Sequence, residues 1–150
     1  MIDHVWSVLC SFSSVDRDSN NISLFNVIEQ LTVEAIGPPP DDAGLPVRME
    51  VVSLWVRRNP ELPARGVARV VLESPGRQPR TFPEFDLDLT AHERLRTQAR
   101  FDGLPISASG RHYMVVEYQA STDSPWQQAA RIPLQVAIQF ETPKQVPPDS

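Results

Sequence analysis

Residues 131–140, Arg131-Ile132-Pro133-Leu134-Gln135-Val136-Ala137-Ile138-Gln139-Phe140, decide the fold class. From Ile132 to Phe140 every second side chain is large and apolar, and the side chains between them are small, polar or proline. A period of two with a single apolar face predicts a half-buried β-strand. Pro133 belongs to the outward set, which indicates that its missing N–H falls at a sheet edge or a strand start.

The same pattern extends outward from this strand through most of the chain. Six further stretches are predicted as strands: 5–13, 47–57, 66–73, 85–89, 95–101 and 111–118. In 5–13 the alternating face consists of Trp6, Val8, Cys10 and Phe12, and we predict that this face is buried. The stretch 111–118 is apolar on both sides, which indicates a central strand.

Two segments leave the choice between strand and helix open. Residues 22–36 fit a helical stripe through Leu24, Val27 and Ile28, and they also fit a strand. Their β-branched content favours a bent or bulged strand over a helix. Thr90-Ala91-His92-Glu93 has the form of a helix capping box, so at most one short helical segment is expected there.

The fold prediction is an all-β, antiparallel two-sheet sandwich of about eight strands, Ig-like or C2-like. All fifteen prolines lie at or after Pro38, in clusters that separate the candidate strands. We expect residues 1–142 to form a single β-sandwich domain and residues 143–150, with three prolines and no apolar alternation, to form a disordered tail.

Composition narrows the class of protein. The chain has 150 residues, a net charge of −5 and one cysteine. It shows no basic and apolar leader, and no apolar run of the roughly 20 residues that a membrane helix needs, so we expect a soluble protein in the cytoplasm. The six glycines form none of the usual phosphate-binding or nucleophile-elbow motifs, and no cofactor or small-molecule ligand is indicated.

Three oxygen-bearing residues suggest a metal site. Asp16, Asp18 and Asn20 alternate as in the start of a calcium loop, but an EF-hand needs glycine and glutamate where this chain has Asn21 and Val27. The EF-hand therefore fails, which leaves a looser calcium loop or, as the favoured alternative, a polar hairpin turn.

Reactive and basic side chains are also weak candidates. Cys10 is expected to be a small buried hydrophobe, with a nucleophile assisted by His4, His92 or His112 as the alternative. Arg57 and Arg58 begin a locally basic stretch that could contact phosphates, yet few aromatics accompany it and the pI is near 5.1. Nucleic-acid and membrane binding are not favoured.

Several stretches together carry a family resemblance. At the start these are Val8-Leu9-Cys10, Ser14-Val15-Asp16 and residues 20–30, and near the end they are residues 110–116 and 132–136. They resemble a family of uncharacterised bacterial proteins, the DUF6941-like group, over nearly the whole chain. The resemblance implies a β-sandwich and supplies neither an activity nor a site.

The sequence therefore predicts a non-enzymatic module that recognises another protein or a second copy of itself. Two alternatives from other classes stay open. One is a C2-like module that binds calcium or an anionic membrane through the loop at Asp16. The other is a hydrolase or transferase that uses Cys10 or a histidine.

Overall fold

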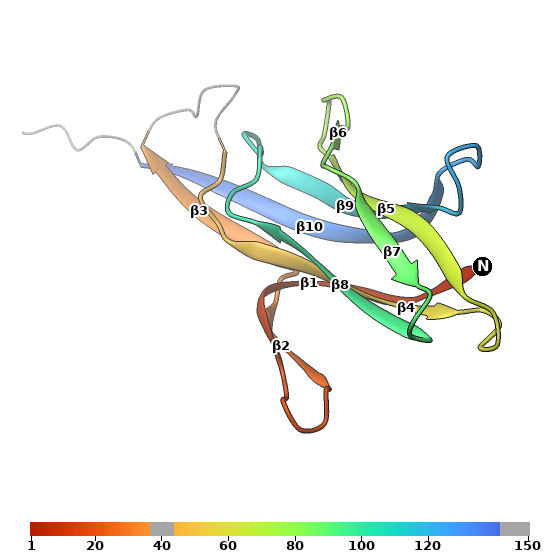
Figure 1. The fold of residues 1–150 in the computed structure, drawn as a ribbon. Coiled ribbons are helices and arrows are strands. Elements are labelled where there is room, and N and C mark those ends of the chain that lie inside the picture. The colour runs from red at the N-terminus through yellow and green to blue at the C-terminus, as the bar shows by residue number, and fades with distance from the viewer. Residues whose placement is uncertain (37–43, 142–150) are drawn as a thin grey trace, which may run out of the picture.

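The computed structural model describes residues 1–36 and 44–141, which form ten β-strands and no helix (Figure 1). The strands are β1 (Ile2–Val15), β2 (Ile22–Val27), β3 (Gln30–Ile36), β4 (Met49–Arg57), β5 (Ala64–Glu73), β6 (Arg80–Thr81), β7 (Phe85–Leu89), β8 (Arg94–Phe101), β9 (Gly110–Gln119) and β10 (Gln127–Glu141). The all-β prediction is confirmed, and the expected number of about eight strands is too low. The predicted tail, 143–150, lies outside the described residues.

The strands form two sheets. Sheet A has the order β2-β1-β4-β8, and sheet B has the order β3-β10-β9-β5-β6, with β7 also pairing with β5. Every pair is antiparallel except β3 and β10, which run parallel in the register Leu31↔Val136 and Val33↔Ile138. The prediction of a purely antiparallel sandwich is therefore wrong, because the chain crosses from one sheet to the other after β2 and enters sheet B beside its last strand.

Residues 22–36 show how this crossing arises. They form two strands, which confirms the preference for strand over helix, but β2 belongs to sheet A and β3 to sheet B. Asn26 has a φ of 54°, and Ile28, between the strands, is only 5% exposed. A left-handed backbone at Asn26 turns the chain, and the buried Ile28 anchors the crossing in the core.

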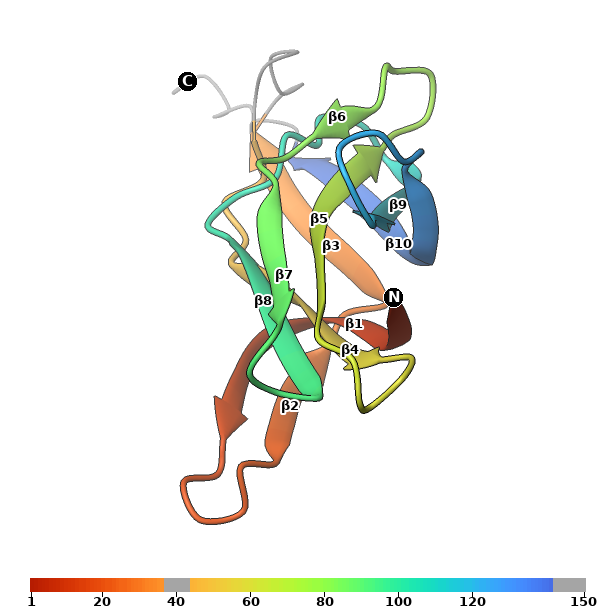
Figure 2. The same ribbon diagram turned by 45° about the vertical axis from the view of Figure 1, so that its right-hand side comes forward.

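The two sheets pack on one hydrophobic core, which gives a sandwich-like arrangement (Figures 1 and 2). Sheet A contributes Leu9, Met49, Val51 and Trp55, and sheet B contributes Val70, Leu72, Met114, Val116, Leu134 and Val136. The indole N–H of Trp55 donates to Thr97 Oγ1 at 3.0 Å, so this fully buried ring has its polar atom satisfied. The buried face predicted for 131–140 is confirmed at Leu134, Val136 and Ile138.

Pro133 occupies the kind of position that its missing N–H requires. It pairs with Tyr113 of β9, while β3 pairs with β10 only from Gln135 onward. At Pro133, β10 therefore has a neighbouring strand on one side only and forms a local sheet edge, where proline is tolerated.

The turn at Thr90-Ala91-His92-Glu93 is not helical. Asp88 Oδ1 accepts hydrogen bonds from the backbone N–H and the hydroxyl of Thr90, at 3.0 and 2.6 Å. The threonine hydroxyl that a capping box would use is thus bound to the preceding aspartate, and the chain turns directly from β7 into β8.

The β1–β2 hairpin extends past the last pair between β1 and β4 as an arm, here defined as residues 11–27 (Figures 1 and 2). Ser13 Oγ donates to Glu50 Oε2 at 2.6 Å, and Gln98 Nε2 donates to Ser13 Oγ at 2.7 Å. Arg96 donates to the backbone oxygen of Asn20 at 2.8 Å. These bonds fix the arm against β4 and β8, so that it leaves the sandwich in a defined direction.

Candidate functional site

The loop proposed for calcium is a hydrogen-bonded turn at the tip of the arm. Asp16 Oδ1 accepts from the backbone N–H groups of Asp18 and Ser19, at 2.9 and 2.8 Å. The bond from Ser19, followed by that from Asp18, lowers the pKa of the Asp16 carboxyl. Asn20 has a φ of 60° and receives Arg96 on its side-chain oxygen at 3.2 Å.

These interactions favour the polar hairpin turn over a calcium loop. Two of the three candidate residues already bind protein donors, and within residues 1–36 and 44–141 no three His, Cys, Asp or Glu side chains lie close enough to hold a metal ion. The calcium-binding alternative stays a prediction.

Cys10 is fully buried in the middle of β1. Burial raises the pKa of its thiol, and the nearby Glu50 carboxylate raises it further. Since the thiolate is the nucleophile, this environment disfavours reaction at neutral pH. The expected burial of Cys10 is confirmed, and this environment favours the interpretation as a small hydrophobe.

His112 and His92 lie in contrasting environments. His112 is fully buried, with Nδ1 3.0 Å from Ser74 Oγ and Nε2 2.9 Å from the backbone oxygen of Ala108. Because a carbonyl only accepts, Nε2 carries the proton and Nδ1 accepts from the Ser74 hydroxyl. His112 is thus structural, as expected, and His92 is exposed at the turn before β8.

His4 forms a pair that the sequence reasoning missed. Its Nε2 lies 2.7 Å from Ser7 Oγ, which lies 2.6 Å from Ser53 Oγ. Residues three apart in a regular strand project to opposite faces, but the register of β1 against β4 shifts between His4 and Trp6. This bulge brings His4 and Ser7 to the same face, and only an irregularity that alternation does not reveal makes the contact possible.

The His4–Ser7 pair has the distance of a base and a nucleophile. The His4 ring packs edge-on against Trp55 with centroids 5.1 Å apart, and burial lowers the pKa of His4 against a smaller opposing effect of a hydrogen bond to the Trp6 backbone. No carboxylate of the described residues is hydrogen-bonded to the His4 ring. The pair therefore lacks the third group that orients the base in a triad.

The basic stretch is divided among separate partners. Arg57 donates to the backbone oxygens of Leu89, Pro60 and Thr90 at 2.7 to 2.9 Å, and so ties the end of β4 to two neighbouring turns. Arg58 pairs with Asp3 at 2.8 Å. With their donors used in this way, neither side chain forms part of a free phosphate-binding cluster.

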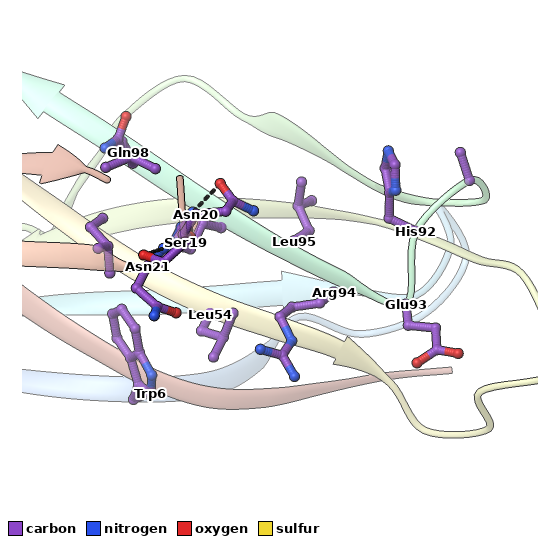
Figure 3. A pocket seen from close by; sticks show the side chains of 14 residues that line it. Trp6, Ser19, Asn20, Asn21, Leu54, His92, Glu93, Arg94, Leu95 and Gln98 are labelled. Carbon is purple, nitrogen blue, oxygen red and sulfur yellow. Dashed lines mark hydrogen bonds between the residues drawn. The ribbon is translucent and has the colours of Figure 1, made fainter. Parts of the chain in front are cut away.

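An open cleft of about 1120 Å³ lies beneath the tip of the arm (Figure 3). Trp6, Leu54 and Leu95 line it together with the arm residues Val15, Ser19, Asn20, Asn21 and Ile22, and with Ala91, His92, Glu93, Arg94, Arg96 and Gln98. Two arginines line the cleft, Arg94 and Arg96. The guanidinium group of Arg96 already donates to the backbone oxygen of Asn20. A second groove of about 800 Å³, between β1 and the strands β9 and β10, includes Ser7.

The outer face of the arm carries exposed aromatic side chains. Phe12 and Phe25 stack with centroids 4.6 Å apart and an interplanar angle of 11°. They are 53% and 42% exposed, and Val27 on the same face is 53% exposed. Ser13 alternates with Phe12 and points toward Glu50, so the two rings point away from sheet A.

The prediction that Phe12 shares a buried face with Cys10 is therefore wrong. Both residues lie on one alternating set of β1, but the pairing of β1 with β4 ends between them. Cys10 still pairs with Glu50 of β4 and is buried, while Phe12 pairs only with Phe25 of β2 and is open to solvent. Periodicity shows which side chains share a face, and not where a strand stops being covered.

No protein-family model and no curated protein matches this chain. Among solved structures, a β-glucosidase from Listeria innocua in complex with glucose has a TM-score of 0.49 and 10% identity, covering 91% of this chain and 17% of the glucosidase. The gluconolactone complex of that enzyme has a TM-score of 0.45 and 11% identity, covering 75% and 15%. The N-terminal domain of PorA has a TM-score of 0.26 and 9% identity, covering 89% and 97%.

These similarities are too low to support a conclusion about fold or function. This chain spans less than a fifth of the length of the β-glucosidase that it matches. The resemblance to the DUF6941-like family is untouched by these matches and stays a prediction. In the described part of the chain no helix is long and apolar enough to cross a membrane.

Proposed function

We propose that this protein is a non-enzymatic, cytoplasmic interaction module that binds protein through the outer face of its hairpin arm. The two sheets are, in this proposal, an Ig-like or C2-like sandwich that acts as a rigid support for the arm. The observation that supports this proposal is the exposed stack of Phe12 and Phe25.

Exposed aromatic side chains at this position favour a role in recognition. Burying a phenylalanine side chain contributes about 1.5–3 kcal/mol, and aromatic residues are enriched in the centres of protein interfaces. The arm presents both rings together with Val27, and its bonds to Glu50, Gln98 and Arg96 hold them in place. A surface that is ordered before binding loses less conformational entropy when a partner arrives.

The test is affinity capture with the double variant Phe12→Ser/Phe25→Ser. Full-length protein is immobilised, native lysate of the source organism is passed over it, and bound proteins are quantified by mass spectrometry. Leu62→Ser is the matched control, because Leu62 is 58% exposed and lies in the loop before β5. The proposal expects partners that the wild type and Leu62→Ser retain and the double variant loses. Equal capture by all three proteins would contradict it.

A second candidate, a hydrolase that uses a histidine, is favoured by the His4–Ser7 distance alone. Neutral His4 could accept the Ser7 proton, and Ser7 lines the groove beside β10. A fluorophosphonate probe tests this directly. Labelling that disappears in both Ser7→Ala and His4→Ala would support the hydrolase, and absence of labelling in the folded wild type would exclude an activated Ser7.

A further inference from the structure

Strand β2 is an open edge of sheet A, since its only neighbour is β1. We propose that a second copy of this chain covers this edge, so that the two β2 strands pair antiparallel and join two four-stranded sheets into one of eight strands. This inference rests on the proposed function of the arm and names the partner. The arm lies at one end of the molecule (Figure 2), and no other strand of the described residues pairs with the outer side of β2.

Backbone geometry shows which groups are available for pairing. The N–H of Asp16 donates to the oxygen of Asn21 at 2.8 Å, so this pair of residues faces inward across the hairpin. In an antiparallel ladder, residues whose backbone groups face the partner strand alternate with residues whose groups face away. From Asn21 it follows that Ser23 and Phe25 face β1, while Ile22 and Leu24 direct their N–H and C=O groups to the open edge.

The composition of β2 sets it apart from the other edges. Its sequence, Ile22-Ser23-Leu24-Phe25-Asn26-Val27, contains neither a charge nor a proline. Proteins usually protect edge strands with charged residues, proline or bulges. The other edge strands in the described part of the chain all carry charges: Arg94, Arg96 and Arg100 in β8, Glu34 in β3, Arg80 in β6, and Asp86 and Asp88 in β7.

This contrast favours a second copy as the partner. None of the charged edges offers an apolar match to β2, whereas β2 itself does. Two identical uncharged strands meet without like-charge repulsion, and a two-fold axis uses each open edge once and leaves none for further growth. The pairing is therefore a closed dimer rather than the start of a fibre.

The extended part of β2 sets the register. Because Asn26 has a left-handed backbone, with a φ of 54°, the regular ladder is confined to the residues before it. With Ser23 opposite its counterpart in the second copy, Ile22 pairs with Leu24 through the backbone groups that both direct to the open edge, and the two Ser23 residues form a non-hydrogen-bonded pair. Such pairs bring opposing Cα atoms to about 4.5 Å and side chains into their closest contact.

Sedimentation velocity of the full chain over a wide concentration range tests the inference. Leu24→Pro removes an N–H that the monomer does not use, and Leu24→Ala is its matched control because it shortens the same side chain and keeps that N–H. Two donors are lost per dimer, so Leu24→Pro is expected to weaken dimerisation about tenfold to a hundredfold relative to Leu24→Ala. Ser23→Lys places two like charges directly opposite each other and is expected to weaken the dimer further.

A cross-linking experiment gives an independent measure of the register. Ser23→Cys should form an interchain disulfide under mild oxidation, because a Cα separation of about 4.5 Å is within disulfide range. Leu62→Cys should not. Circular dichroism confirms that each variant is folded, and if Leu24→Pro fails to fold, Ser23→Lys and Ser23→Cys test the inference in its place.

The outcomes separate this inference from the proposed function. The second-copy inference is overturned if the wild type is monomeric at every concentration and the Ser23→Cys variant forms no disulfide. If that monomer still captures a partner through Phe12 and Phe25, the proposed function stands with a different partner. A dimer whose affinity neither Leu24→Pro nor Ser23→Lys lowers also overturns the inference, since it uses another surface.

Discussion

Replacing His112 with leucine should destabilise the fold through two specific hydrogen bonds. The imidazole joins β9 to the turn after β5 through Ser74, at 3.0 Å, and to the loop before β9 through the Ala108 oxygen, at 2.9 Å. Leucine is of similar size but apolar, so it can form neither bond.

The expected loss follows from the groups left behind. A buried polar group that loses its partner costs about 1–3 kcal/mol, and both Ser74 and Ala108 are only half-buried, so water can reach them in part. We therefore expect His112→Leu to lower the free energy of unfolding by about 2 kcal/mol. For a chain of this size that corresponds to a fall in Tm of roughly 4–8 °C.

Urea unfolding followed by circular dichroism is the assay, with two companion variants. Ser74→Ala removes one of the bonds and should cost about 1 kcal/mol. In the double variant the two losses should not add, because both single changes break the Ser74 bond. His112→Gln returns a donor near Ala108 and should recover part of the stability. A loss below about 0.5 kcal/mol for His112→Leu, or full additivity with Ser74→Ala, would refute the assigned bonds.

Three further results are expected. Cys10 should resist iodoacetamide at pH 8 in the native state and react in urea, because burial and Glu50 raise the pKa of its thiol; rapid native alkylation, measured by mass spectrometry, would contradict this. Folding lowers the pKa of His4 from 6.5, so below that pH the unfolded state binds more protons than the folded state. The free energy of unfolding should therefore decrease as the pH falls from 6.5 to the folded-state pKa. His4→Phe should reduce this pH dependence in denaturant titrations at pH 7 and pH 5. Arg57→Lys should lower the free energy of unfolding by about 1–2 kcal/mol, because lysine cannot reach the oxygens of Leu89, Pro60 and Thr90 together. Arg58→Lys should lower it by less than about 1 kcal/mol, because the pair of Arg58 with Asp3 is partly exposed. Thermal melting measures both changes.

Local periodicity predicted the strands that are covered along their length. The stretch 131–140 alternates because sheet B covers one face of β10, and the side chains of Leu134, Val136 and Ile138 are buried as expected. The turn after β5 can also be predicted from the sequence, since Pro75-Gly76 favours a type II turn with a positive φ at glycine. Gly76 has a φ of 67°. These features depend on neighbours in the sequence.

Features that depend on distant residues were beyond such reasoning. The parallel pairing of β3 with β10 joins two ends of the chain, and nothing in Gln30–Ile36 specifies that partner. The His4–Ser7 pair depends on a bulge against β4, and the exposure of Phe12 depends on where the pairing of β1 with β4 ends. In each case the local pattern was read correctly and the tertiary context decided what it meant.

The pairing of β3 with β10 also has a consequence for the order of events in folding. Gln30 contacts Gln135, so this pair closes a loop of about 105 residues. The hairpin of β1 and β2 needs only its six-residue turn and can form early, whereas β3 has no strand to pair with until β10 is in place. During synthesis on the ribosome, β3 would therefore wait as an unpaired segment for most of the time that the chain takes to emerge. Slow completion of sheet B, and a need for protection of β3 in the interval, follow from this single parallel pair.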